Sequence, residues 1–174
     1  MSDVIDDQIV NATAAASITQ FLGRESMLLD EYRWAEWFET LDEKFIYEIP
    51  IRVVKDPGEA EFLEDVFRVR DNMDMIRMRL ERLASGTDWA ERPLSRTVRV
   101  VGSIFVNVTE QADIYCANSA TQVFRQRGQD RKWDLIAARR RDLIKVSRDK
   151  CTLVRRTIFL ADTILQTPNL GIFL

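Results

Sequence analysis

Apolar positions in the first part of the chain recur with the period of a helix. From residue 14 onward they fall three or four residues apart, which places them along one stripe of a helix. The apolar members of this stripe are Ile18, Phe21, Leu22, Leu28 and Leu29, and Glu25 has the same spacing. Asn11 or Ser17 can cap its start. A second short helix is predicted around residues 34–41, and a third at 73–83 with Gly86 as its C-terminal stop.

Later in the chain the apolar period shortens to two, which is typical of strands. The run TVRVVGSIFVNV (97–108) places five apolar residues at one parity and Arg99 at the other. The five are Val98, Val100, Ile104, Val106 and Val108. Three more strand-like runs follow at 114–125, 133–146 and 151–165. Four long strands joined by short turns predict an antiparallel meander.

One more strand is predicted between the second and third helices. It spans residues 44–54, and Pro50 near its middle favours an edge position or a bulge. The next segment, 55–67, holds a Pro-Gly pair and five acidic residues, so we expect a surface loop with at most one helical turn.

Together these elements predict an α+β fold in one domain of residues 1–174. The helices should pack on one face of a curved, mainly antiparallel sheet. Residues 1–13 would form a flexible N-terminal arm. Residues 14–85 would supply the helices with the first strand, and 96–174 the antiparallel sheet.

The absence of histidine narrows the possible chemistry. Without histidine, and with only Cys116 and Cys151, the 174 residues offer no His-based metal site and no catalytic triad. Two distant cysteines cannot hold zinc or an iron–sulfur cluster, and we interpret both as buried thiols. No Walker loop or GxGxxG motif is present. We therefore expect no metal, no cofactor and no metalloenzyme's catalytic residues in this chain.

Charge and hydropathy argue against two classes of partner. The net charge is −3, and no DNA- or RNA-reading motif accompanies the arginines, so nucleic acid is not an expected partner. The apolar runs are shorter than the ~20 residues of a membrane helix. The acidic N-terminus lacks the basic region of a secretory signal. We expect a cytoplasmic protein with no membrane partner.

An arginine-rich stretch at 139–156 is interpreted as two strands joined by a turn. Apolar residues occupy both parities of the second strand, with Arg155 on one side and Arg156 on the other. Helices of the same chain can cover only one face of the sheet, so another surface should cover the second. We predict that the arginines anchor ion pairs at that covered surface. Solvated strand arginines without partners are the alternative.

Acid–base chemistry in a small pocket is a further possibility for such a fold. The candidate residues are Asp30, Asp42, Tyr47, Asp113 and Tyr115. Most of these carboxylates flank helix ends and turns, where capping or solvation is the simpler interpretation. Trp34, Trp37 and Phe38 could line a pocket, yet their helical spacing favours core packing.

Several blocks resemble the small (β) subunit of aromatic-ring-hydroxylating, Rieske non-haem iron dioxygenases. They are FLGRESMLLDEYRWAEWFETLDEKFIYEIPIR, RLASGTDWAERPLSRTVRVVGSIFV, ARRRDLI, RRTIFLADTIL and NLGIFL, in the family's order. Residues 86–97 carry its Gly–Trp–Glu–Pro–Ser–Arg–Thr pattern. The resemblance runs from about residue 17 to 174. Leu94 stands where many relatives have a second proline, and the final hairpin lacks the usual Gly-Trp.

This resemblance implies a fold, partners and a function. The fold would be a cystatin-like, nuclear-transport-factor-2-like cone. Three large (α) and three small (β) subunits would assemble, with self-association of the small subunit as a trimer. The Rieske [2Fe-2S] cluster and mononuclear Fe(II) would lie in the α subunit. NAD(P)H would supply electrons through a reductase and a ferredoxin. The complex would convert aromatic compounds to cis-dihydrodiols, with a structural, noncatalytic role for this chain.

Neighbouring subunits would then cover the second face of the sheet. We predict five interface residues that would pair with or pack on those neighbours: Trp89, Arg96, Arg140, Arg155 and Arg156. Two alternatives remain open, a stand-alone isomerase or dehydratase of the same fold and a self-associating small-molecule binding module.

Overall fold

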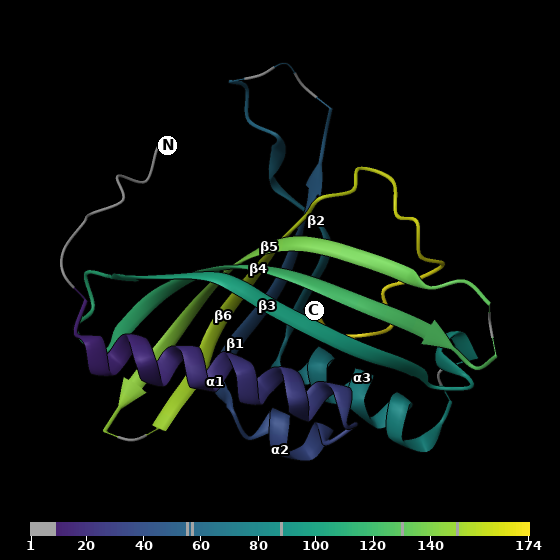
Figure 1. Cartoon of the computed structure of the whole chain (residues 1–174), viewed down its shortest axis with the longest axis horizontal. Helices are drawn as coiled ribbons and strands as arrows, with labels where there is room; N and C mark the ends of the chain where they lie inside the picture. Colours follow the sequence, from purple (N-terminus) through teal and green to yellow (C-terminus); the bar gives the residue numbers. More distant parts are fainter. Residues whose placement is uncertain (1–9, 55, 57, 88, 130, 149) are drawn as a thin grey trace.

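A computed structural model describes residues 10–174 except 55, 57, 88, 130 and 149. The elements are α1 (Ala12–Asp30), α2 (Trp34–Phe38), β1 (Leu41–Arg52), β2 (Phe62–Asn72), α3 (Met73–Ser85), the 3-10 helix η1 (Trp89–Glu91), β3 (Ser95–Val108), β4 (Ile114–Arg127), β5 (Asp134–Ser147) and β6 (Lys150–Leu160). Figure 1 shows a curved sheet that arches over the helices, all of which lie on one side of it. The α+β prediction is confirmed.

The six strands form one sheet in the order β2-β1-β6-β5-β4-β3. Neighbouring strands are antiparallel except β1 and β6, which run parallel. We call the side that carries the helices the inner face and the opposite side the outer face (Figure 1). Within the described residues, no helix is long and apolar enough to cross a membrane.

The predicted helices are confirmed, and their caps explain their bounds. α1 begins at Ala12 because the Asn11 side chain accepts a hydrogen bond from the Thr13 backbone N–H, 2.9 Å away. The helix thus includes residues that we assigned to a flexible arm, and residues 1–9 of that arm lie outside the described part. Asn72 caps α3, and Gly86 ends it with φ at +67°, a conformation that favours glycine.

One prediction about strands is wrong. The segment 55–67 is not all loop, because β2 begins at Phe62 and pairs with β1. The predicted meander of four long strands is confirmed, because β3, β4, β5 and β6 are consecutive antiparallel neighbours, whereas β1 lies between β2 and β6 and not at an edge. The alternative of a bulge at Pro50 is confirmed, since the β1–β2 register shifts on both sides of it.

Bulges also change which side chains face the core. In β3 the register shifts between Gly102 and Phe105, so the parity that looks continuous in the sequence reverses there. Val98 and Val100 are consequently exposed, while the Arg99 side chain is buried. β6 has an extra residue at Val154, where Leu143 pairs with Arg155 and Ile144 with Leu153.

The C-terminal segment completes the core from the inner side. After β6 the chain loops around one end of the sheet and returns beneath it (Figure 1). Phe173 and Leu174 are buried there, and the Phe173 ring lies 4.6 Å from Trp37 and 5.8 Å from Tyr47 between centroids. The guanidinium of Arg79 stacks on Phe173 at 4.2 Å. This segment fills the space between sheet and helices.

Candidate functional site

Four charged side chains meet between α1 and the inner face of β5 and β6. We call Glu25, Arg140, Asp142 and Arg156 the inner charge cluster. Arg156 binds Asp142 through two hydrogen bonds of 2.8 and 3.0 Å, and Glu25 through two of 2.6 and 2.7 Å. Its Nη1 also donates to the Leu174 carbonyl at 3.1 Å. Bidentate pairing on two sides gives all five donors of this buried guanidinium an acceptor.

Arg140 is buried beside this pair, and its contacts are looser. Its Nε donates to Ser119 at 3.4 Å, and its Nη atoms lie 3.9 Å from Glu25 and 3.7 Å from Asp142. Nη2 has no hydrogen-bond partner among the described residues. The cluster thus holds two cations and two carboxylates, which balances its charge.

Neighbouring charges fix the protonation of the cluster. Burial alone would raise the pKa of the Glu25 carboxyl, but Arg156, with help from Arg140 and Trp37, holds it below its ordinary value. Burial would lower the pKa of Arg156, and Asp142 and Glu25 raise it instead. Burial and the nearby Arg156 lower the pKa of Arg140. A permanently ionised Glu25 cannot act as a general acid at neutral pH.

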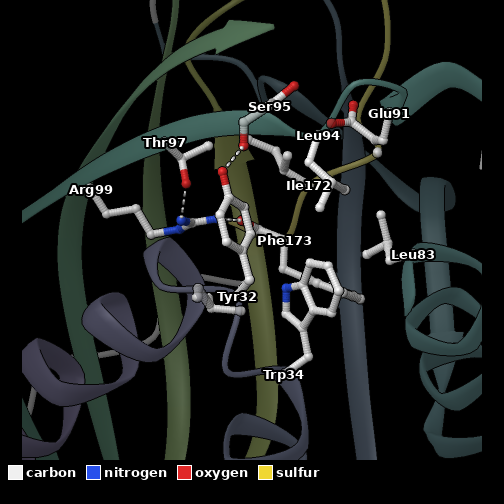
Figure 2. Close-up of a pocket in the computed structure, with 12 residues that line it drawn as sticks. Tyr32, Trp34, Leu83, Glu91, Leu94, Ser95, Thr97, Arg99, Ile172 and Phe173 are labelled. Atoms are coloured by element: carbon white, nitrogen blue, oxygen red, sulfur yellow. Dashed lines mark hydrogen bonds between the residues drawn. The ribbon is translucent and has the colours of Figure 1, made fainter. Parts of the chain in front are cut away.

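A second set of buried polar contacts lies at the C-terminal end of α1, and Figure 2 shows two of its members, Thr97 and Arg99. Asp30 accepts hydrogen bonds from the Thr97 hydroxyl at 2.7 Å and the Arg99 backbone N–H at 2.8 Å, and it pairs with the Arg99 guanidinium. Arg99 also donates to the Phe173 carbonyl at 2.6 Å. Asp30 therefore ties the end of α1 to β3 and to the C-terminal segment.

A third buried ion pair joins η1 to β4. Arg125 pairs with Glu91, and both are almost fully buried. Arg125 also donates to the Ser95 hydroxyl at 2.9 Å and to the Asn169 carbonyl at 3.1 Å. Like the other two groups, this pair holds a distant segment of the chain against the inner face.

The space between α1, β3 and the C-terminal segment is almost filled. The cavity in Figure 2 has a volume of about 30 Å³ and is lined by Tyr32, Trp34, Ser95 and Phe173 among others. That is about the volume of one water molecule, whereas small-molecule sites usually measure roughly 300–1,000 Å³. The inner face can hold helices and tail in place, but this cavity cannot hold an aromatic substrate.

The five candidate acid–base residues do not converge on one site. Asp30 is occupied by Thr97 and Arg99, Asp42 accepts from the Lys44 backbone N–H at 2.9 Å, and Asp113 lies 3.4 Å from Lys145 at the surface. The Tyr47 hydroxyl accepts from the Leu174 backbone N–H at 3.0 Å, and burial raises its pKa. Among the described hydrogen bonds, none joins two of these five residues. Core packing is confirmed for Trp37.

The predicted interface residues divide between the two faces. Arg140 and Arg156 lie inside the chain, and the carboxylates that we expected on a neighbouring subunit are this chain's own Glu25 and Asp142. The bulge at Val154 sets Arg155 on the outer face, where it binds Glu48 at 2.9 and 3.0 Å. Arg96 is exposed and donates to Gln126 at 2.6 Å.

Trp89, the aromatic residue among the five predicted positions, has 88% of its surface accessible. Its role at an interface, and those of Arg96 and Arg155, stay predictions. The burial of the inner acids was missed, because the helix period was not used to place Glu25. One signal was available, since Glu25 falls on the apolar stripe of α1 between Leu22 and Leu29.

Metal binding has no support in the described part of the chain. Its residues include no group of three or more His, Cys, Asp or Glu side chains placed to hold an ion. Cys116 and Cys151 are both half-buried thiols. The residues present therefore do not fit an iron centre.

Comparisons with known proteins agree on one relationship. A family model described as "Ring hydroxylating beta subunit" matches residues 24–167. The chain is 34% identical to the N,N-dimethyl phenylurea N-demethylase subunit beta of Sphingobium sp. (strain YBL2), over 89% of this chain and 88% of that protein. It is 30% identical to the benzene 1,2-dioxygenase subunit beta of Pseudomonas putida, over 90% and 86%.

Two solved structures show the fold. A chain of naphthalene 1,2-dioxygenase with indole bound in the active site superposes with a TM-score of 0.84 at 21% identity, covering 97% of this chain and 89% of that one. A protein with a cystatin-like fold from Nostoc punctiforme PCC 73102 superposes with a TM-score of 0.59 at 15% identity, covering 90% and 97%. The predicted cystatin-like fold is confirmed.

Proposed function

The chain belongs to the family of ring-hydroxylating beta subunits, and on that premise we propose that it is the structural, noncatalytic small subunit of a multicomponent aromatic-ring-hydroxylating dioxygenase. The observation that carries the noncatalytic role is that, in the part of the chain that the structure describes, none of the five candidate acid–base residues lines a recess of substrate size. Paired charges and the C-terminal segment leave a cavity of about 30 Å³ between α1, β3 and the tail, and the open recess of about 560 Å³ beside α2 and α3 is lined by none of these five residues. The residues suited to acid–base chemistry are engaged in contacts that hold the fold.

The same observation weighs against the two alternatives. A stand-alone isomerase or dehydratase needs an acid and a base beside an open pocket. Here Tyr47 contacts the backbone of Leu174, and Asp30 contacts Thr97 and Arg99. A small-molecule binding module would need an enclosed volume about ten times that of the cavity between α1 and β3, and the recess of about 560 Å³ beside α3 is open to solvent.

In this proposal the redox chemistry belongs to a large α subunit. That subunit would hold a Rieske [2Fe-2S] cluster and a mononuclear iron, and three copies would assemble with three copies of this chain. A reductase and a ferredoxin would pass electrons from NAD(P)H. The complex would add both atoms of O₂ to an aromatic compound to give a cis-dihydrodiol. The cytoplasmic location expected from the sequence stays a prediction.

Expression of the tagged chain with and without a Rieske-type large subunit from the same operon tests this proposal. We expect the chain alone to contain no stoichiometric iron and to consume no O₂ with aromatic substrates. The co-purified complex should contain iron and oxidise the substrate. Tightly bound iron in the isolated chain, or failure of any large subunit to co-purify, would contradict the proposal. Product analysis separates ring dihydroxylation from N-demethylation, the reaction named for one relative.

A further inference from the structure

The cavity between α1, β3 and the C-terminal segment has polar groups in its wall. Arg99 and Thr97 of β3 line it together with Tyr32, which follows α1, and Phe173 of the C-terminal segment. Cavities that stay empty in proteins are lined by apolar side chains, whereas polar cavities hold ordered water. The volume of about 30 Å³ has room for one molecule of the size of water. The hydrogen-bonding groups of the wall therefore decide what occupies it.

One of these groups is a buried donor without an acceptor. The Arg99 side chain is 2% exposed. Its Nη1 contacts Asp30 and Thr97, and its Nη2 donates to the Phe173 carbonyl at 2.6 Å. Its Nε has no hydrogen-bond partner among the described residues. An unpaired buried donor costs free energy, so such a group in a folded protein is normally bonded to the chain or to an ordered water.

The charge of Arg99 makes this unpaired donor more costly. Burial lowers the pKa of the Arg99 guanidinium, and the charge of Asp30 opposes that change. A further hydrogen-bond acceptor beside Nε would stabilise the charged form of the side chain.

Tyr32 supplies an acceptor on the same cavity wall. The Tyr32 hydroxyl donates to the Ser95 carbonyl at 3.1 Å, and no described residue donates to the hydroxyl oxygen. A tyrosine hydroxyl can accept a hydrogen bond while it donates another. Figure 2 shows the Arg99 guanidinium pointing toward Tyr32. A molecule between the two side chains can therefore accept from one and donate to the other.

The charges around the cavity argue against an ion in this position. Asp30 already balances Arg99, and Arg125 balances Glu91, another residue of the cavity wall. An added anion or cation would be a buried charge without a counter-charge, which is costly. A small neutral molecule that both accepts and donates hydrogen bonds fits the wall.

We propose that the cavity binds one water molecule, which accepts a hydrogen bond from Arg99 Nε and donates one to the Tyr32 hydroxyl. The water connects the turn after α1 to β3 at the place where the C-terminal segment passes. It adds to the contacts by which Asp30 joins these segments. The site belongs to the fold of this chain, so the inference goes beyond the proposed function and does not depend on it.

NMR spectroscopy of the isotope-labelled full chain tests the site, because the Nε–H groups of buried arginines give separate signals. A rotating-frame experiment distinguishes contact with a long-lived water from proton exchange by the sign of the cross-peak. We expect a contact cross-peak between water and the Arg99 Nε–H, whose signal is identified by its loss in Arg99→Lys.

Arg125 and Arg156 are matched internal controls in the same spectrum. Both side chains are buried, but their Nε atoms already have acceptors within the chain. Arg125 Nε donates to Ser95 at 2.9 Å, and Arg156 Nε donates to Asp142 at 2.8 Å. Neither signal should show a contact with water. Equal cross-peaks for the three arginines would indicate general hydration and would overturn the proposal.

Tyr32→Phe removes the acceptor and keeps the aromatic ring. The variant should lose the water cross-peak of Arg99, whereas Tyr115→Phe on β4, which does not line this cavity, should keep it. Persistence of the cross-peak in Tyr32→Phe would contradict the Tyr32 contact. Should that variant fail to fold, the comparison of the three arginines in the unmodified chain still decides.

A crystal structure of the unmodified chain provides an independent measurement. One peak of density should lie within hydrogen-bond distance of both Arg99 Nε and the Tyr32 hydroxyl. A cavity without density, or anomalous scattering from bromide at this position, would overturn the proposal. These measurements need no large subunit, so their failure would leave the proposed function standing, and absence of a large-subunit partner would not affect this site.

Discussion

The two faces of the sheet distribute charge and apolar surface in opposite ways. The inner face buries Arg99, Arg125, Arg140 and Arg156 among carboxylates of the same chain. The outer face exposes valine, phenylalanine and leucine side chains. In an isolated globular domain the reverse distribution is usual. The inner face thus holds the chain together, and the exposed apolar side chains agree with the proposal that the outer face contacts other subunits.

Buried ion pairs act on the inner face as ties between distant segments. Arg156 joins α1, β5 and the C-terminal residue, and Arg125 joins β4 to η1 and the tail. The free energy lost when such charges are desolvated is about as large as the free energy gained from their attraction. These pairs therefore contribute more to the specificity of the fold than to its stability. Removal of one partner is costly, because it leaves the other charge buried and unpaired. Mutations should therefore distinguish the two faces: removing one charged side chain from the inner face should destabilise the folded chain, and removing one from the outer face should not.

The largest effect should follow from Arg156→Met. The change leaves Glu25 and Asp142 buried with only the loosely placed Arg140 as a cation, and it should lower the free energy of unfolding by about 3–5 kcal/mol. Urea unfolding at fixed protein concentration measures it. The quadruple variant Glu25→Met, Arg140→Met, Asp142→Leu, Arg156→Met, which leaves no charge of the cluster unpaired, should recover part of the loss. A loss below about 1 kcal/mol in the single variant would show that the cluster is not what holds the inner face.

Phe173→Ala tests the apolar part of the same face. Phe173 is 2% exposed and packs on Trp37, Tyr47 and Arg79. Truncation should cost about 3 kcal/mol through lost burial and the cavity that remains. The matched control, Phe105→Ala on the outer face, should cost the isolated chain less than about 1 kcal/mol. If urea unfolding showed the same loss of unfolding free energy for both variants, the inner face would contribute no more to the stability of the chain than the outer face.

Acid should weaken the inner face in a way that depends on Glu25. Its pKa in the folded chain lies below the ordinary value of 4.5, so its contribution to stability is complete above about pH 4.5 and disappears as the pH falls through the lowered pKa. The difference in unfolding free energy between the unmodified chain and Glu25→Gln should be constant near neutral pH and shrink in acid. The exposed Glu81→Gln should show no such trend. A pH-independent difference for Glu25→Gln would contradict the assignment.

Periodicity predicted the parts of this fold that depend on local sequence. The three helices and the caps at Asn11 and Gly86 follow from apolar spacing and backbone preference, and the structure confirms them. β2 was missed because its first residues include acids and follow a Pro-Gly pair. These residues form a strand because they pair with β1. The position of β1 beside β6 depends on a pairing between distant segments, which local pattern does not encode.

The alternation of residues along a strand predicted the wrong face wherever a bulge shifts the register. Val98 and Val100 have the spacing of core residues, yet they face outward, because the register changes between Gly102 and Phe105. The same effect at Val154 separates Leu153 from Arg155. Such shifts exchange the residues that face the inner and outer sides of the sheet. The alternation of polar and apolar residues therefore did not predict that the inner face is charged. The C-terminal segment also fills the inner side through long-range contacts that the sequence leaves open.

The smallest effect on the isolated chain, and the sharpest separation of the faces, should come from Arg155→Ala and Arg96→Ala. Arg155 is adjacent to Arg156 but points outward, and its side chain is 44% exposed. Its partner Glu48 keeps Arg70 at 3.1 Å and Thr157 at 3.5 Å, so no carboxylate is left unpaired. Within the described residues, Arg96 would lose its hydrogen bonds to Gln126 and the Gly128 carbonyl.

Each of these two changes should therefore alter the unfolding free energy by no more than about 1 kcal/mol. Assembly is expected to respond differently. Removing an arginine that is desolvated against a neighbouring subunit costs roughly 2–5 kcal/mol of binding free energy, because its partner stays buried and unpaired. This effect is measured by following the dissociation of the complex with the large subunit as the protein concentration is lowered. Arg156→Met should destabilise the chain itself, whereas Arg155→Ala should loosen only the complex. If Arg155→Ala and Arg96→Ala assemble as the unmodified chain does, these outward arginines are solvated strand residues, and the apolar side chains alone account for the contacts of the outer face.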